Sequence, residues 1–320
     1  SPTPPKPGAN SSAVSDIMES SAPTHHPSRR KAWIEATRPR TLPVSTAGVL
    51  AGCAVALFQG NFIWQVALIC FLFAMTAQIV SNFANEYFDF KSGFDKKGRE
   101  GFRRGVTEGD ISPRAMKTAT FALLGLDCLL GCSLMMWGGW QLIPVGVAIA
   151  IFAIAYSAGP YPLSHHGLGD LAVVIFFGIV PVYFTASLQA PGSATAALAL
   201  PAGLATGLLA ANVLIVNNYR DADDDRAVGK HTTVVIFGRK TMGIAYLISA
   251  VAALAILCCI TSLRASSLFA AGWVIIAQLY VLVWRKMLSS KGAQLNVILK
   301  RTAQLMLLAC LYLLIISIMA

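Results

Sequence analysis

Charged side chains are scarce in this chain. Asp, Glu, Lys and Arg make up 12% of its 320 residues, while hydrophobic residues make up 56%. A soluble domain contains about 25% charged residues. Together with a mean hydropathy of +0.63, the shortage of charge excludes an ordinary soluble protein and indicates a polytopic membrane protein.

Other common features are missing as well. The seven cysteines lie within apolar runs and none belongs to a Cys-x-x-Cys pair, which argues against a structural zinc site and against structural disulfides. No Ser-His-Asp or Cys-His arrangement suggests a covalent enzyme intermediate. Residues 1–28 are rich in Ser, Pro, Thr and His and lack the apolar core of a signal peptide. We therefore predict a disordered tail there and a membrane domain over residues 29–320.

The sequence does contain a series of nine apolar runs. About 20 apolar residues cross a bilayer as a helix, and only helices and closed barrels satisfy their backbone hydrogen bonds in lipid. We therefore predict an all-α bundle of nine transmembrane helices. The expected spans cover residues 42–58, 62–84, 115–137, 140–158, 171–190, 194–216, 241–263, 265–284 and 302–320.

The loops between these runs are alternately rich and poor in Lys and Arg. They gather before the first run and in the loops 85–114, 217–240 and 285–301, whereas the intervening loops contain only Arg264. Cytoplasmic loops of membrane proteins carry the excess of basic residues. We therefore predict a cytoplasmic N-terminus and an external C-terminus in the inner (plasma) membrane. The net charge of +10 then follows from topology and does not indicate a nucleic-acid partner.

Two acidic motifs follow apolar runs. The first contains Asn85, Asp89 and Asp95, and the second contains Asn217, Asp221 and Asp225. In each motif Asn precedes an Asp by four residues, and side chains four apart share one face of a helix. Gly93 allows the chain to turn back, so that Asp95 can rejoin Asp89. Because both motifs lie on the predicted cytoplasmic side, we predict two parallel four-helix repeats followed by a ninth helix.

Carboxylates at the edge of the hydrocarbon are costly unless they bind something. Mg²⁺ takes oxygen ligands and is usually shared with substrate phosphates. We predict a Mg²⁺ site whose ligands are Asn85, Asp89, Asp95, Asn217, Asp221 and Asp225, with the four Asp as catalytic residues. Nearby basic side chains can grip the outer oxygens of a diphosphate. These are Lys91, Arg103, Arg104, Arg220 and Lys230.

Other polar residues have plainer interpretations. We expect Asp223 and Asp224 to be solvated surface residues. Asp127 lies in the middle of an apolar run, so it should face the bundle interior, with either a structural or a functional role. His165 and His166 follow the fourth run, and we expect a surface role for them.

The two motifs, Asn85-x3-Asp89-x5-Asp95 and Asn217-x3-Asp221-x3-Asp225, resemble those of the UbiA superfamily of intramembrane aromatic prenyltransferases. Three further segments, at 33–43, 167–171 and 217–232, are similar to the branch that prenylates 1,4-dihydroxy-2-naphthoate in menaquinone synthesis. The resemblance covers about residues 31–320. Glu86 departs from the family, which more often has Asp after the motif's Asn. Since Glu86 lies off the Asn85–Asp89 stripe, we expect the chemistry to be unaffected.

The resemblance implies nine helices around a central cavity that opens laterally to lipid. It implies that two Mg²⁺ ions assist transfer of a polyprenyl group from polyprenyl diphosphate to 1,4-dihydroxy-2-naphthoate. The carboxylated ring carbon is the target, so CO₂ is lost and a demethylmenaquinol forms. The resemblance also implies a set of substrate-binding residues. This set contains Arg38, Asp170 and Asn218, together with Asn85, Asn217 and the five basic residues near the motifs. The lipid bilayer is the expected environment of the chain, and no obligate protein partner is expected.

Two other interpretations stay open. A different acceptor, such as 4-hydroxybenzoate or homogentisate, would leave the predicted fold and metal site unchanged. A transporter would place its polar site near the membrane midplane, whereas only Asp127 is central here. A phospholipid-forming phosphotransferase is excluded, because its Asp-Gly signature followed by Ala-Arg is absent.

Overall fold

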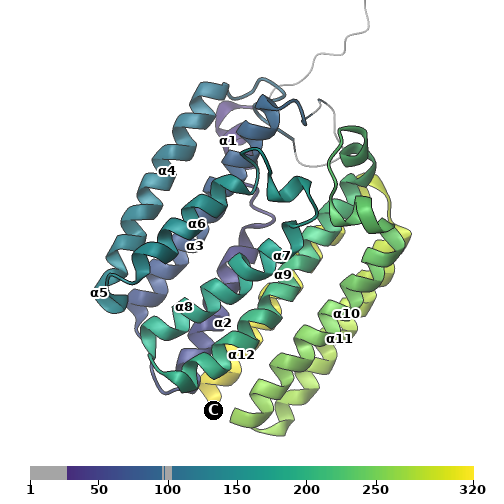
Figure 1. Ribbon diagram of the computed structural model, residues 1–320. Coiled ribbons are helices and arrows are strands. Elements are labelled where there is room, and N and C mark those ends of the chain that lie inside the picture. The colour runs from purple at the N-terminus through teal and green to yellow at the C-terminus, as the bar shows by residue number, and fades with distance from the viewer. Residues whose placement is uncertain (1–26, 96, 98–102) are drawn as a thin grey trace, which may run out of the picture.

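The computed structural model describes residues 27–95, 97 and 103–320, and within these ranges the chain is helical with no strand (Figure 1). The predicted tail, apart from its last two residues, lies outside the described residues. The helices are α1 (Arg29–Ala36), α2 (Leu42–Phe58), α3 (Trp64–Lys91), α4 (Pro113–Ser133), α5 (Met135–Gly138), α6 (Leu142–Ala155), η1 (Leu163–His165), α7 (Gly169–Val173), η2 (Val174–Ile179), α8 (Val180–Gln189), α9 (Ser193–Ala227), α10 (Thr233–Arg264), η3 (Ser267–Phe269), α11 (Ala270–Ser289), η4 (Gly292–Gln294) and α12 (Leu295–Met319).

Every predicted apolar run forms helix, which confirms an all-helical membrane protein. Seven helical stretches are long and apolar enough to cross a bilayer, and α7, η2 and α8 together make one of them. The other two apolar helices, α2 and α6, have 17 and 14 residues, below the about 20 that span hydrocarbon without distortion. The count of nine spans therefore stays a prediction.

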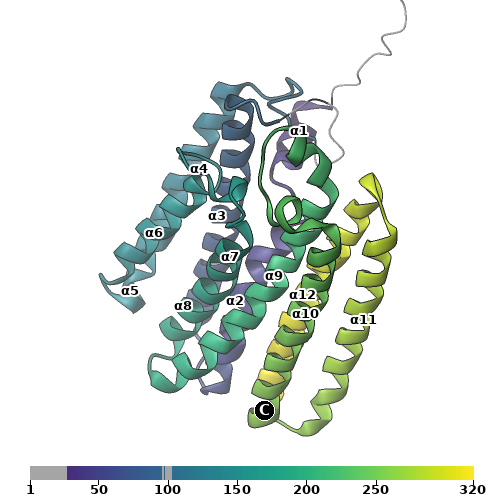
Figure 2. The same cartoon turned by 45° about the vertical axis from the view of Figure 1, so that its right-hand side comes forward.

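Helix α9 is the centre of the bundle. In its most apolar stretch 72% of residues are buried, against 17% for the stretch formed by α4 and α5. It packs against α2, α8, α10 and α12, while α3, α4 and α6 form one flank and α10 and α11 the other (Figures 1 and 2). Glycines allow close approach to η2, since a Cβ on Gly207 would lie 2.5 Å from the backbone oxygen of Val174.

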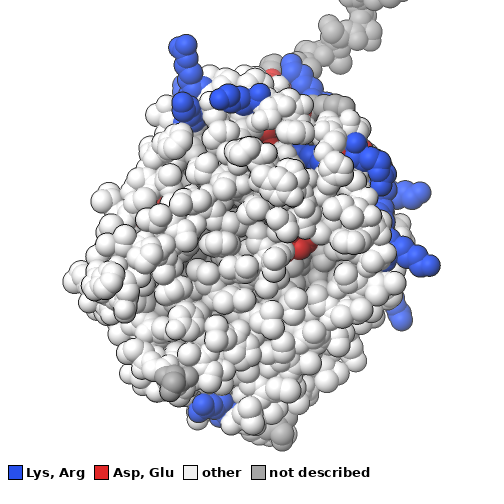
Figure 3. Space-filling model, viewed as in Figure 1, with Lys and Arg blue, Asp and Glu red and all other residues white. Residues whose placement is uncertain are grey.

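The two ends of the bundle differ in charge. Lys and Arg side chains gather mainly at the end that carries α1 (Figure 3). Helix α12 starts at this end, where Asn296 accepts a hydrogen bond from Arg220 of α9, and the C-terminus lies at the opposite end (Figure 1). This asymmetry matches the pattern of basic loops.

The helices that carry the acidic motifs end in the same way. After α3, Gly93 has φ +73° and the amide of Phe94 donates to the carbonyl of Asp89. After α9, Gly229 has φ +76° and the amide of Lys230 donates to the carbonyl of Asp225. Glycine in the left-handed region is the usual means of closing a helix C-terminus. Each turn folds the next residue back toward the motif.

Candidate active site

The two acidic motifs meet in one cavity of about 90 Å³, which we call the polar pocket. Because α3 and α9 both continue beyond their apolar stretches, the motif stripes remain helical and face each other across this pocket. The predicted residues that line it are Arg38, Asn85, Asp89, Arg104, Asp170, Asn217, Asn218, Asp221, Asp225 and Lys230. It is completed by Tyr156, Ser164, Gly167, Gly169, Leu214, Thr232 and Thr233. The roles of these residues stay predictions.

The first motif is held by partners from distant parts of the chain. Asp89 is fully buried, with Oδ2 2.8 Å from Lys230 Nζ and Oδ1 3.3 Å from His165 Nε2. Asn85 accepts a hydrogen bond from Arg38 at 2.6 Å and donates one to Ser157 at 2.9 Å. The side chains of Asp89 and Asn85 therefore present fixed oxygen atoms beside cationic side chains.

The second motif is organised by Arg220. Its guanidinium donates to both carboxylate oxygens of Asp221, at 2.7 and 2.8 Å, and to Oδ1 of Asn217 at 2.9 Å. The pairing is bidentate, which gives a charge-assisted contact with fixed geometry. Arg220 itself does not line the polar pocket, so it orients the motif from behind rather than facing the cavity.

The described part of the loop before α4, from residue 103 onward, contacts the first motif. Glu86 is buried and its Oε1 accepts the amide of Val106 at 2.9 Å. Arg104 lies with Nε 3.3 Å from Oδ2 of Asp95 and faces the pocket. Glu86 thus anchors the loop that carries Arg104, a role that the sequence does not predict.

Besides Arg220, three predicted residues do not line the polar pocket. Lys91 is exposed at the end of α3. Arg103 pairs with Asp110 at 2.8 Å, and this hydrogen bond raises the pKa of its guanidinium above the ordinary value. Asp95 contacts Arg104 instead of lining the pocket. For Lys91 and Arg103 the geometry offers no support as diphosphate ligands.

The sequence interpretation missed several residues of the site, above all His165. The expected surface role is wrong, because His165 is 5% exposed and contacts Asp89. Its ring packs edge-on against Phe94, with centroids 4.5 Å apart. Tyr156 and Thr233 were also missed. The available signal was topological, because the loop around residue 165 follows an even number of predicted spans and so shares the side of both motifs.

The polar pocket continues into apolar space. A junction pocket of about 110 Å³ shares Arg38, Asn85, Tyr156, Leu214 and Asn217 with it. The junction pocket in turn shares Gln78, Ser81, Phe152 and Phe177 with a larger apolar cavity of about 250 Å³. The three cavities therefore adjoin one another, in an order that runs from charged residues to hydrocarbon-like walls.

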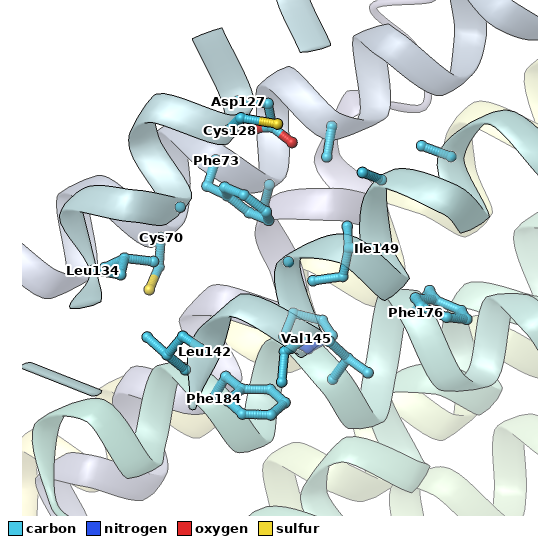
Figure 4. Close-up of a pocket in the computed structure, with 18 of the residues that line it drawn as sticks. Cys70, Phe73, Asp127, Cys128, Leu134, Leu142, Val145, Ile149, Phe176 and Phe184 are labelled. Atoms are coloured by element: carbon cyan, nitrogen blue, oxygen red, sulfur yellow. The ribbon is translucent and has the colours of Figure 1, made fainter. Parts of the chain in front are cut away.

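The apolar cavity lies between α3, α4, α6 and the η2–α8 segment. Figure 4 shows Phe73, Leu142, Val145 and Phe184 around it. Phe152 and Phe176 stack with centroids 3.8 Å apart, near its junction with the pocket. Asp127 is the only acidic lining residue and is 4% exposed, with no hydrogen-bonding partner for Oδ1 among the described residues. The expectation that Asp127 faces the interior is confirmed.

The donor atoms of the polar pocket suit a hard divalent cation. Carboxylate and amide oxygens are provided by Asn85, Asp89, Asn217, Asp221 and Asp225. Among the described residues no three His, Cys, Asp or Glu side chains converge as a ready-made metal cluster. Mg²⁺ is commonly held by one or two carboxylates together with substrate phosphates. The donor set therefore fits an ion that arrives with a phosphorylated substrate.

Comparison with known proteins identifies the family. Residues 45–316 match the UbiA prenyltransferase family. A 1,4-dihydroxy-2-naphthoate octaprenyltransferase of Escherichia coli (strain K12) is 42% identical over 217 residues, which cover 66% of this chain and 70% of that protein. The enzyme of the same name from Mycobacterium tuberculosis is 36% identical over 206 residues, covering 64% and 70%.

Solved structures share the fold at low sequence identity. The apo structure of a UbiA homologue from Aeropyrum pernix K1 superposes with a TM-score of 0.67, at 16% identity, over 87% of this chain and 98% of that one. A UbiA homologue from Archaeoglobus fulgidus bound to DMAPP and Mg²⁺ gives 0.62, at 15% identity, over 90% and 99%. The chain is an integral membrane protein and belongs to the UbiA prenyltransferase family.

Proposed function

We propose that this protein transfers a polyprenyl group from polyprenyl diphosphate to 1,4-dihydroxy-2-naphthoate in a Mg²⁺-dependent reaction, with loss of the carboxylate as CO₂. The observation that carries the proposal is the succession of adjoining cavities from the polar pocket through the junction pocket to the apolar cavity. A prenyl diphosphate has the same polarity, with a charged head and an apolar tail. The relatives named as naphthoate octaprenyltransferases supply the acceptor.

The acidic motifs hold the metal in this proposal. Asn85, Asp89, Asn217, Asp221 and Asp225 provide the oxygen donors, and Asp95 assists from the loop through Arg104. When bound, Mg²⁺ neutralises the charge that develops on the leaving diphosphate. Lys230 and Arg104 line the same pocket and can bind the outer diphosphate oxygens. Both cations are buried, so their attraction to the leaving group is weakly screened.

The walls beyond the polar pocket protect the allylic cation that remains. Phe152 and Phe177 line both the junction pocket and the apolar cavity. Aromatic faces attract cations, and apolar walls keep water from capturing the reactive carbon. The tail extends along the apolar cavity toward lipid. The naphthoate ring then enters the junction pocket, where Arg38 offers its guanidinium to the acceptor's carboxylate.

The membrane arrangement completes the proposal. We infer nine spans, with α2 and α6 counted among them, arranged as two parallel four-helix repeats and a ninth helix. The end with the basic loops and the polar pocket faces the cytoplasm of the inner membrane, where charged substrates are soluble. The C-terminus is external.

Product mass tests the function directly. The purified protein in nanodiscs is given one long prenyl diphosphate, Mg²⁺ and, in separate reactions, 1,4-dihydroxy-2-naphthoate, 4-hydroxybenzoate or homogentisate. We expect turnover with the naphthoate, dependence on Mg²⁺, and an adduct lighter by CO₂ than the simple sum. An adduct that keeps its carboxylate, or faster turnover with 4-hydroxybenzoate, would assign another acceptor. No diphosphate release with any acceptor would favour a transporter.

A further inference from the structure

Asp170 is an acidic residue of the polar pocket that lies outside both acidic motifs. Its Oδ2 accepts a hydrogen bond from the hydroxyl of Thr233 at 2.5 Å. Its Oδ1 is shielded from solvent and, among the described residues, has no hydrogen-bonding partner. By contrast, Asp89 faces Lys230, and Asp221 faces Arg220. Asp170 therefore differs from Asp89 and Asp221 in its electrostatic surroundings.

A buried oxygen without a partner is costly, because it loses its water without replacement. Such groups in native structures often have a catalytic role or a missing partner. The Thr233 hydrogen bond fixes the carboxyl group and leaves Oδ1 as the available acceptor. Asp170 is thus a fixed acceptor of one further hydrogen bond.

The surroundings of Asp170 place it beside the junction pocket. Asp170 lies in the first turn of α7, and Val173, one turn later, lines the junction pocket. Tyr156 lines both pockets, and its hydroxyl oxygen would lie 3.4 Å from a Cβ built on Gly169. The Tyr156 hydroxyl therefore packs at the backbone just before Asp170. An aromatic ring bound in the junction pocket would therefore lie beside Tyr156 and the first turn of α7.

Resting on the function proposed above, we infer that Asp170 is the catalytic base that accepts the proton of the acceptor hydroxyl adjacent to the carboxylated carbon. As the allylic C–O bond breaks and diphosphate leaves, the carboxylated ring carbon forms the new C–C bond. The neighbouring hydroxyl passes its proton to Oδ1 of Asp170 and becomes a ketone. The resulting β-keto carboxylate loses CO₂, and the enolate oxygen takes the proton back. No oxidant or reductant is consumed.

The carboxylates of the two motifs are less suited to this step. Asp89 and Asp221 already contact cations, which stabilise their charged form and reduce their affinity for a proton. In the proposed reaction they also bind the metal. A separate carboxylate avoids a conflict between holding the metal and accepting a proton.

The test compares two variants. Asp170→Asn keeps the shape and the oxygen that accepts from Thr233 but loses the carboxylate, whereas Thr233→Val removes that hydrogen bond and keeps the carboxylate. Turnover is measured with 1,4-dihydroxy-2-naphthoate and with ring-halogenated analogues whose hydroxyls are more acidic. Equilibrium binding of a non-hydrolysable prenyl thiodiphosphate with Mg²⁺ is measured separately. General-base catalysis contributes about 10²–10⁴-fold, so we expect a loss of that size in kcat for Asp170→Asn.

The loss should shrink as the analogue hydroxyl becomes more acidic, because less help is then needed to remove the proton. Thiodiphosphate affinity should stay within about twofold of wild type, and Thr233→Val should lose much less activity, with no dependence on acceptor acidity. Equal losses in both variants, a loss independent of acidity, or weakened thiodiphosphate binding by Asp170→Asn would each overturn the base assignment. If Asp170→Asn does not fold, Asp170→Glu carries the test, since a base should then keep measurable turnover with wild-type dependence on acidity. Wild-type failure to prenylate the naphthoate would instead refute the proposed function.

Discussion

Lys230 and Asp89 are separated by 141 positions in the chain, yet Nζ of the lysine lies 2.8 Å from Oδ2 of the aspartate, and the Asp89 side chain is fully shielded from solvent. The contact joins the end of α9 to the end of α3. It depends on the turn at Gly229, which directs Lys230 back over the pocket. The first motif is therefore completed by a residue that follows the second motif.

Removing the negative charge of this pair should impair stability and activity by separable routes. Asp89→Asn leaves Lys230 buried without its counter-charge, and such a loss costs about 3–5 kcal/mol. Adding Lys230→Met should recover most of this stability, because the lysine that lost its counter-charge is then no longer charged. Activity should be absent in both variants, since the proposed metal ligand is missing. Thermal unfolding and prenyl transfer are the measurements, and full turnover by Asp89→Asn would refute the shared site.

Substitutions of two nearby acidic residues on α9 should have very different effects on activity. Asp221 is 2% exposed and lines the pocket, whereas the Asp223 side chain is 71% exposed and pairs with Arg226 and Arg239. Two residues along a helix rotate the side chain by about 200°. Asp221→Ala should abolish transfer, while Asp223→Ala should keep activity within about twofold, because exposed ion pairs contribute little. Comparable losses of activity in both variants would contradict the assignment of Asp221, and not Asp223, to the face of α9 that lines the pocket.

Glu86 should act through the loop that it anchors. Glu86→Ala removes the acceptor for the amide of Val106, so the loop with Arg104 should loosen and the KM for prenyl diphosphate should rise. We expect the KM to rise about five- to tenfold, which is equivalent to the loss of one hydrogen bond of about 1–1.5 kcal/mol. Glu86→Gln keeps an oxygen acceptor and should behave close to wild type. Hydrogen exchange at residues 103–111 should increase in the alanine variant alone.

The apolar cavity should limit the length of the prenyl tail. Gly146 lines it, and a Cβ there would meet nothing within 4 Å. Gly146→Leu should therefore fold and fill part of the cavity. We expect turnover to persist with a short prenyl diphosphate and to fall with a long one. Gly125→Leu is the matched control, because Gly125 is also unobstructed but lies outside the cavity. Equal chain-length profiles in both variants would place the tail elsewhere.

Membrane orientation can be read from reporters. A reporter at the C-terminus should be external, and reporters inserted at residues 96–104 and 226–232 should be cytoplasmic, because basic loops stay inside. Arg104 and Lys230, one from each of these segments, line the polar pocket. Reporters that placed these loops on opposite sides of the membrane would exclude a shared site.

The sequence by itself determined the class of the protein and the local geometry of the motifs. Long apolar runs leave helices as the stable backbone form in lipid, so the helical architecture followed from composition. The four-residue steps from Asn85 to Asp89 and from Asn217 to Asp221 specify a shared face wherever the helix continues, because helical periodicity is local. These stripes were predicted correctly as parts of helices, and the structure brings them into one pocket.

Only the tertiary structure decided which residues complete the site. Arg103 and Arg104 are adjacent in sequence, yet the first pairs with Asp110 while the second faces the pocket. His165 reaches Asp89 from a loop that carries no Lys or Arg. Such positions depend on loop conformations and on contacts between distant helices, for which sequence spacing provides no periodic rule. Helix faces are set within a few residues, whereas the partners of those faces are chosen by the packing of the whole bundle.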